Sequence, residues 1–137
     1  VDASADMVAF ARQQFDAAAW PNLRFEVVDA RRLNFDARFD RVVSFNALHW
    51  VPQQASVLRG IRAALKPHGR AHLRLVTRAA LTSLEEVAEA VRQEPAWAPH
   101  FAGFIDPYLR LDAQQYGELA AGLGLQTISS HSATKAS

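Results

Sequence analysis

The feature that most constrains this chain is a short apolar run that ends in polar and aromatic residues. Residues 39–51 read FDRVVSFNALHWV, in which the run at 42–45 is followed by Asn46 and then by His49 and Trp50. Open α/β sheets bind ligands beyond the carboxyl ends of their buried strands. We therefore expect this stretch to be the strand that builds the working face of a small α/β enzyme.

The composition is that of one globular domain. The chain has 137 residues, of which 50% are hydrophobic and 21% are charged, and its formal net charge is +1. No basic run stands out, so the sequence does not favour a nucleic-acid partner. No apolar run approaches the roughly 20 residues that span a bilayer, so we expect no membrane partner. We predict a single domain over residues 1–137.

The chain contains no cysteine. This excludes a disulfide framework and a thiolate metal site, and it fits a reducing compartment. The N-terminus lacks the basic segment and apolar core of a signal peptide, so we expect a cytoplasmic location. The first residue is Val rather than Met, which indicates that the chain begins inside a longer gene product.

Hydrophobic spacing and turn residues predict alternating helices and strands. The expected helices cover residues 4–18, 52–65, 82–94 and 112–122, and the expected strands cover residues 23–28, 40–45, 70–77 and 125–128. Strand–helix–strand alternation with short joints implies a parallel sheet with helices packed on it. The fold class is therefore α/β.

Three of the expected helices begin with a capping signal. Ser4 can cap the first helix, and the pairs Thr82/Glu85 and Asp112/Gln115 have the spacing of a capping box. The apolar faces predicted from the spacing comprise Met7, Phe10, Ala11, Phe15 and Ala18 in the first helix, Val57, Leu58, Ile61, Ala64 and Leu65 in the second, Leu84, Val87, Ala88 and Val91 in the third, and Tyr116, Leu119, Ala120 and Leu123 in the last.

Two stretches leave alternatives open. His72 and Arg74 alternate with apolar residues in the strand expected at 70–77, so either one face of that strand is wet or its polar side chains point to a site. The segment 95–111 is rich in aromatic residues and proline and looks irregular. Its Trp97 and Phe101 are either lid residues over a substrate or part of the core.

Four pieces of sequence, VDASADM, VVDARRL, FDRVVSFNALHWV and LKPHGRAHL, occur in this order. Together they resemble the class I S-adenosylmethionine-dependent methyltransferases. The nearest group is the small-molecule methyltransferases that include the trans-aconitate and juvenile-hormone-acid enzymes. The resemblance covers nearly the whole chain. It implies a Rossmann-like methyltransferase fold with a mostly parallel sheet and helices on both faces, S-adenosylmethionine as the cofactor, and a small-molecule substrate.

The resemblance implies a role for residues in the first two pieces. Asp2, followed by Ala3, matches the acid that binds the ribose hydroxyls, and Met7 matches a side chain that packs near the adenine. Asp29 matches the acid that accepts from the adenine amino group, and Ala30 lies beside the ring. A carboxylate offers only acceptors, which suits two neighbouring hydroxyl donors. Taken singly, both acids are more typical of turns and helix starts than of a cofactor site.

The third piece is expected to meet the reacting groups. Asn46 and Ala47 match the strand end where backbone groups contact the methionine part of the cofactor. His49 and Trp50 match positions that line the cleft between methyl donor and acceptor. A carboxylate acceptor would need no base, whereas a hydroxyl or carbon acceptor would, and His49 is the candidate base because its ordinary pKa is near 6.5. The alternative is a structural histidine. No metal is required.

The sequence departs from the family pattern at both ends. The glycine-rich loop after the first strand is absent, since the first glycine is Gly60, and the seventh, antiparallel strand is not seen. We therefore expect a fold that is incomplete at the N-terminus and the C-terminus, with self-association through open sheet edges. Two other interpretations stay open: a truncated, non-catalytic domain and a nicotinamide-dependent Rossmann enzyme.

Overall fold

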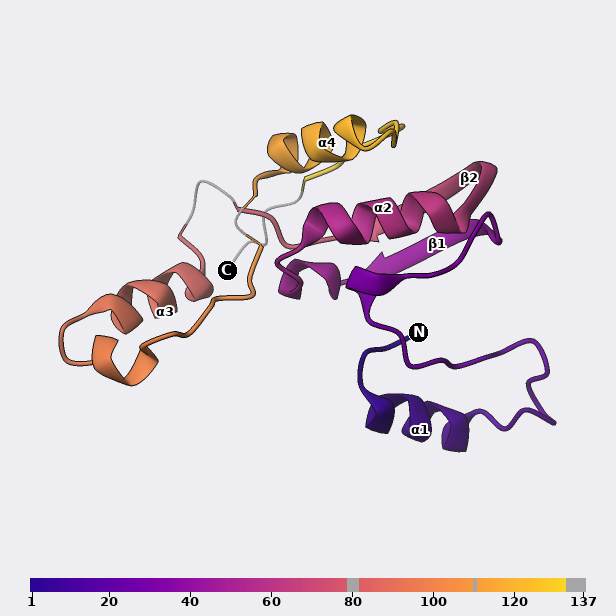
Figure 1. Ribbon diagram of the computed structural model, residues 1–137, viewed down its shortest axis with the longest axis horizontal. Helices are drawn as coiled ribbons and strands as arrows, with labels where there is room; N and C mark the ends of the chain where they lie inside the picture. Colours follow the sequence, from indigo (N-terminus) through magenta and orange to yellow (C-terminus); the bar gives the residue numbers. More distant parts are fainter. Residues whose placement is uncertain (79–81, 110, 133–137) are drawn as a thin grey trace. The chain divides into compact units, whose positions relative to one another are not determined.

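The computed structural model describes residues 1–78, 82–109 and 111–132. The elements are α1 (Ala5–Gln14), η1 (Ala30–Arg32), β1 (Phe39–Phe45), η2 (Leu48–Trp50), α2 (Gln54–Ala64), β2 (Leu65–Arg74), α3 (Leu84–Gln93), η3 (Ala98–Phe101) and α4 (Ala113–Gly122), where η denotes a short 3-10 helix (Figure 1). Helices and strands alternate through the middle of the chain, so the predicted α/β class is confirmed.

The chain forms two compact units. The first consists of Val1–Val42 and Ser56–Ala71, and the second consists of Val43–Ala55 and the described residues after Ala71. The chain passes from one unit to the other within β1, α2 and β2. None of the helices in the described parts of the chain is long and apolar enough to cross a membrane.

The sheet formed by the described residues has two strands, β1 and β2. Phe39, the first residue of β1, lies beside the middle of β2, where a Cβ added to Gly69 would be 3.1 Å from the Phe39 carbonyl oxygen. At the other end, the Asn46 N–H donates to the Arg74 carbonyl at 3.0 Å. The contacts run in the same order along both strands, from Phe39 and Gly69 to Asn46 and Arg74, so the strands are parallel, as predicted, and α2 is the crossover between them.

The best-packed face of the molecule is that of α2, which runs alongside the two strands in Figure 1. Val57, Leu58, Ile61 and Ala64 recur at helical spacing and are each at most 2% exposed. Burial of a large aliphatic side chain contributes about 1.5–3 kcal/mol. The predicted apolar face of this helix is confirmed, except that Leu65 already belongs to β2 and is half-buried.

The strand expected at residues 23–28 is not formed. Its only ladder contact in the described residues is an isolated parallel bridge between Asp2 and Val27. The Asp2 N–H donates to the Glu26 carbonyl at 3.2 Å, and the Val28 N–H donates to the Asp2 carbonyl at 2.9 Å. A strand requires a partner along its length, and here one residue supplies all of the pairing.

The strand expected at 125–128 is also wrong. The Leu125 N–H donates to the Ala120 carbonyl at 3.0 Å, which closes the end of α4 instead of pairing with a strand. No strand follows in the described part of the chain. The strand expected at 70–77 is shifted, because β2 begins at Leu65 and ends at Arg74. Its polar face is exposed to water: His72 and Arg74 are exposed, while the alternating residues Ala71, Leu73 and Leu75 are half-buried.

Capping signals located the helix starts to within one residue. Ser4 caps α1, as predicted, by accepting from the Met7 N–H. The Asp112/Gln115 capping box of α4 is confirmed. The box of α3 is formed by Ser83 and Glu86 instead of Thr82 and Glu85. The sequence TSLEE offers both pairs at the same spacing, so local pattern alone could not choose between them.

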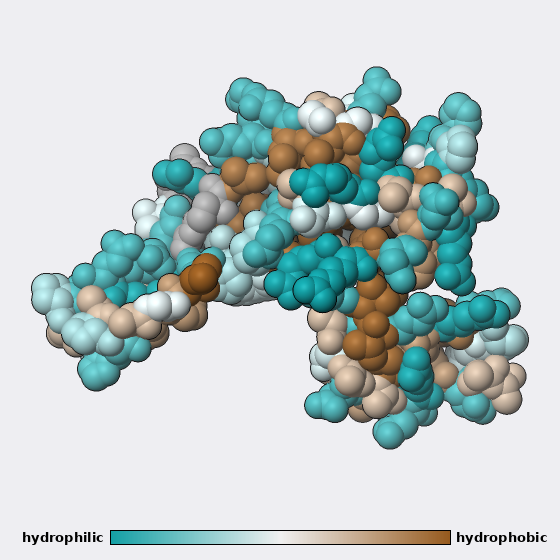
Figure 2. All heavy atoms as spheres, in the orientation of Figure 1, coloured by the Kyte–Doolittle hydropathy of each residue, from teal (hydrophilic) through white to brown (hydrophobic). Residues whose placement is uncertain are grey.

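The predicted apolar faces of α1 and α3 are wrong, since most of their large side chains are exposed. In α1, Val8 is buried while Met7 and Phe10 are more than half exposed. The described residues of α3 include no buried side chain, and Leu84 is 80% exposed. Apolar side chains accordingly reach the surface among polar ones, as Figure 2 shows for one face of the molecule.

Candidate functional site

The turn after β1 carries the His-Trp pair. β1 ends at Phe45, and Asn46 then adopts a φ of 55°, in the left-handed region that asparagine tolerates better than most residues. Ala47 is the N-cap of η2, whose next residues include His49 and Trp50. The bend at Asn46 therefore places His49 and Trp50 directly beyond the carboxyl end of β1.

His49 is held as a buried, neutral imidazole. Its side chain is 5% exposed, and burial lowers its pKa from the ordinary 6.5, against a weaker opposing effect of the Glu85 charge. Its Nδ1 accepts a long hydrogen bond of 3.4 Å from the Val76 N–H. In a neutral ring whose Nδ1 is an acceptor, the proton resides on Nε2. His49 is therefore a hydrogen-bond donor at pH 7.

Tyr108 joins the pair to form a cluster of three rings. The ring centroids of His49 and Tyr108 are 5.7 Å apart, those of Trp50 and Tyr108 are 5.2 Å apart, and those of His49 and Trp50 are 5.3 Å apart. The Leu109 N–H also donates to the His49 carbonyl at 2.7 Å. Trp50 remains 51% exposed, so it presents the open side of the cluster.

Tyr108 is a site residue that sequence reasoning missed. It is buried, and its N–H donates to the Asp106 Oδ1 at 3.0 Å. The only sequence signal was its position in the irregular aromatic segment, which did not separate it from Trp97 or Phe101.

Gln54 was missed as well, and no local pattern points to it. It is the first residue of α2 and is 3% exposed. Its Nε2 donates to the carbonyls of Leu48 and Val51 at 2.5 and 2.6 Å. These carbonyls stand immediately before and after the His-Trp pair, so the Gln54 amide bridges the turn that carries it.

Asp2 offers a carboxylate with spare acceptor capacity in the first unit. Its Oδ1 accepts from the Ser4 N–H at 2.8 Å, and the residue is exposed. Ala3 follows it, and Met7, in the first turn of α1, is more than half exposed. A carboxylate with one donor bound can accept further hydrogen bonds, so the side chains present fit a ribose diol.

The Asp29 carboxylate forms an ion pair with the neighbouring Arg31 guanidinium. It caps η1, which begins at Ala30. Its Oδ1 accepts from the Arg31 backbone N–H at 2.9 Å and from Arg31 Nε at 3.0 Å. Its Oδ2 accepts from Arg31 Nε at 2.9 Å and from Nη2 at 2.5 Å. These bonds lower the pKa of Asp29 to about 2. Both carboxylate oxygens are engaged, so Asp29 fits an adenine amino group only when the Arg31 side chain moves away.

The structure brings the two acids of the first unit close along the backbone. Val28 bonds to Asp2, and Asp29 is the next residue. The sequence-predicted residues of the first unit are Asp2, Ala3, Met7, Asp29 and Ala30, and those of the second are Asn46, Ala47, His49 and Trp50. Their roles toward a cofactor stay predictions. Within the described ranges, no group of three or more His, Cys, Asp or Glu residues could hold a metal ion.

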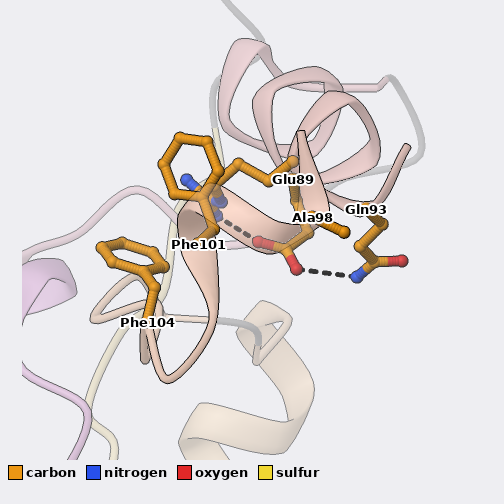
Figure 3. A pocket seen from close by; sticks show the side chains of 6 residues that line it. Glu89, Gln93, Ala98, Phe101 and Phe104 are labelled. Atoms are coloured by element: carbon orange, nitrogen blue, oxygen red, sulfur yellow. Dashed lines mark hydrogen bonds and ion pairs between the residues drawn. The ribbon is translucent and has the colours of Figure 1, made fainter. Parts of the chain in front are cut away.

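A separate hollow of about 310 Å³ lies between α3 and η3 (Figure 3). Arg92 stacks over the Phe104 ring at 4.6 Å and pairs with both Glu89 and Asp106, the latter at 3.3 Å. Two carboxylates offset its single charge. Phe101 also lines the hollow and is partly exposed, and Trp97 is half-exposed, so neither is a core residue.

Comparison with known proteins decides the family. The sequence profile of the family described as "Methyltransferase domain" matches residues 1–69, half of the chain. The chain belongs to the methyltransferase domain family. A protein of Invertebrate iridescent virus 6 named "Putative methyltransferase 235L" is 23% identical over 126 residues, which cover 92% of this chain and 45% of that protein. The methyltransferase chain thus spans less than half the length of this relative.

Family membership confirms the broad methyltransferase prediction and argues against the nicotinamide alternative. The matched region begins at Val1 and ends at Gly69. It therefore includes every residue that the sequence singled out for the cofactor and for methyl transfer, including Asp2, Asp29, His49 and Trp50. The small-molecule subgroup stays a prediction.

Proposed function

We propose that the protein containing this methyltransferase chain transfers a methyl group from S-adenosylmethionine to a small-molecule acceptor, and that the acceptor atom is a carboxylate oxygen. The observation that carries the choice of acceptor is the state of His49. The alternatives are a hydroxyl or a carbon acceptor.

The hydrogen bonds of His49 favour an acceptor that needs no base. Its Nδ1 accepts from the Val76 N–H, so in the neutral ring the proton lies on Nε2 and neither nitrogen is free to take a proton. A hydroxyl or carbon acceptor must lose a proton when it is methylated, whereas a carboxylate is already ionised at pH 7. The Nε2–H can instead donate to one carboxylate oxygen and orient the acceptor.

Other residues supply binding and shape. The Asp2 carboxylate would hold the ribose hydroxyls, and Met7 would pack against the adenine. The exposed Trp50 ring would cover the acceptor and exclude water. S-adenosylmethionine supplies an activated methyl group on sulfur, so the tasks left to the protein are alignment and exclusion of water.

The test uses the complete gene product and S-adenosylmethionine labelled in its methyl group. We would incubate both with a panel of small carboxylic acids and a matched panel of the corresponding alcohols. We expect the label to be transferred to the acids alone. The labelled products should be methyl esters, which alkali hydrolyses. Transfer to alcohols, at a rate that rises with pH and is lost in His49→Asn, would contradict the carboxylate assignment. Failure to bind S-adenosylmethionine in calorimetry would contradict the function.

A further inference from the structure

We propose that Gln54 is a positioning residue for methyl transfer: its side-chain amide fixes the η2 turn and thereby sets where His49 and Trp50 stand. The role in catalysis rests on the function proposed above. The structural role, that the amide fixes the turn, is independent of that function.

The geometry of the amide is specific to this turn. Nε2 lies 2.5 Å from the Leu48 carbonyl and 2.6 Å from the Val51 carbonyl. These two residues flank His49 and Trp50 in sequence, so the amide closes a ring around the pair. An amide nitrogen carries two hydrogens, and both are used here.

The other half of the amide lacks a partner among the described residues. Gln54 Oε1 is buried and receives no hydrogen bond within the part of the chain that the structure describes. Burial of an unpaired acceptor costs free energy that an apolar side chain of the same shape would not cost. Packing alone therefore does not account for an amide here, whereas the two bonds that hold the turn do.

The bonds from Gln54 complement those made from other segments. The Leu109 N–H donates to the His49 carbonyl, and the Val76 N–H donates to its Nδ1. These contacts hold the histidine itself. The carbonyls at the two ends of the turn are bound differently: that of Leu48 accepts from the Val51 N–H within the turn at 3.0 Å and from Gln54 Nε2, and that of Val51 accepts from Gln54 Nε2.

The chain offers a matched control at the preceding position. Gln53 is the same residue type and is exposed, so Gln53→Met makes the same chemical change outside the turn. Gln54→Met keeps the approximate length of the side chain but removes both donated bonds and the unpaired oxygen. Gln54→Glu keeps the shape and replaces the donor by an ionised acceptor that faces two carbonyls.

The experiment is NMR of the complete protein without substrate or cofactor. It follows the His49 imidazole signal, identified with His49→Asn, and the Trp50 indole signal, identified with Trp50→Phe. We expect both signals to shift and broaden in Gln54→Met and to stay in place in Gln53→Met. The thermal midpoint of Gln54→Met should also fall, because the carbonyls of Leu48 and Val51 lose the amide donor. In Gln54→Glu, the Trp50 signal should return as pH falls, because the protonated carboxyl can donate again.

Three results would overturn the proposal. The first is that His49 and Trp50 signals remain unchanged in both Gln54 variants. The second is a fall in thermal midpoint in Gln54→Met with the signals of the folded form unchanged, which would make Gln54 a plain packing residue. The third is methyl transfer by Gln54→Met at the unaltered rate. We expect a tenfold or greater loss of kcat, about 1.4 kcal/mol, with KM and S-adenosylmethionine affinity retained.

Failure of the proposed function is distinguishable from failure of this inference. If no acid accepts a methyl group, the NMR result still decides whether the Gln54 amide fixes the turn. If acids are methylated but the signals do not respond to Gln54, the function stands and the positioning role is lost.

Discussion

The imidazole of His49 stands edge-on to the phenol ring of Tyr108, with 5.7 Å between the ring centroids and 67° between the planes. This contact joins the turn after β1 to the irregular segment before α4, two stretches that lie far apart in the sequence. Edge-to-face packing of this kind stabilises aromatic pairs beyond the area they bury. It also removes the imidazole from water, which lowers the His49 pKa.

The buried His49 should make the stability of the chain depend on pH. Its folded pKa is below the ordinary value of 6.5, so its contribution is present above pH 6.5 and is lost as pH falls through the folded pKa. We expect the free energy of unfolding to decrease over this interval and the decrease to be smaller in His49→Asn. Denaturant titrations at a series of pH values measure this. Equal pH profiles for the two proteins would contradict a buried neutral ring.

His49→Asn should lower turnover of the complete enzyme and leave cofactor affinity nearly unchanged. The substitution removes the Nε2 donor from the acceptor side without altering the acids of the first unit. His68→Asn is a suitable control, because His68 is exposed and has a φ of 66° that asparagine tolerates. Turnover and S-adenosylmethionine binding are measured separately. An equal loss of both would indicate a structural role.

Asp2→Ala should weaken S-adenosylmethionine binding by the complete protein. Loss of hydrogen bonds to a charged acceptor costs about 2–3 kcal/mol, or roughly 30- to 150-fold in Kd. Asp6→Ala, an exposed acid in the first turn of α1, is the control and should bind normally. Calorimetry decides, and a change of less than about threefold for Asp2→Ala would remove the ribose assignment.

Arg31 should govern the titration of Asp29. Its bonds hold the pKa of Asp29 at about 2, so Arg31→Met should move this pKa up toward its ordinary value of 3.8. The same change frees the carboxylate to accept from an adenine amino group, and we expect tighter cofactor binding. Carbon-13 NMR of the carboxyl groups measures the pKa of Asp29, and calorimetry measures the affinity for S-adenosylmethionine. A titration unchanged by Arg31→Met would show that the ion pair does not form in solution.

Residues 1–137 made alone should self-associate and bind S-adenosylmethionine at least about a hundredfold more weakly than the complete protein, or roughly 2.7 kcal/mol. β1 pairs with β2 alone in the described part of the sheet, and its Val43 and Phe45 are 60% and 63% exposed. Apolar open edges promote association. Sedimentation should show oligomers of residues 1–137, and the oligomeric fraction should be smaller for the Val43→Lys variant. A monodisperse monomer that binds the cofactor at micromolar concentration would contradict both expectations.

Local sequence determined the elements whose signals lie within one or two turns. Ser4 and Asp112 cap their helices through bonds to residues three positions away, and the apolar spacing of α2 marks the face that is buried. The succession of strand, helix and strand around α2 also implied parallel pairing. Such features depend on neighbours in the chain, so they are visible in the sequence itself.

Tertiary structure decided everything that depends on a distant partner. The stretch 23–28 has strand-like residues but, among the described residues, pairs with Asp2 alone, so no strand forms there. The His-Trp pair was recognised from its position after a strand, yet the tautomer of His49 follows from Val76 and its burial from Tyr108. Gln54 is a different case, because its partners Leu48 and Val51 are only six and three residues away, but their carbonyls meet its amide only in the folded turn. Hydrogen bonds and ring contacts between separate segments form only when packing brings those segments together, and no local pattern encodes them.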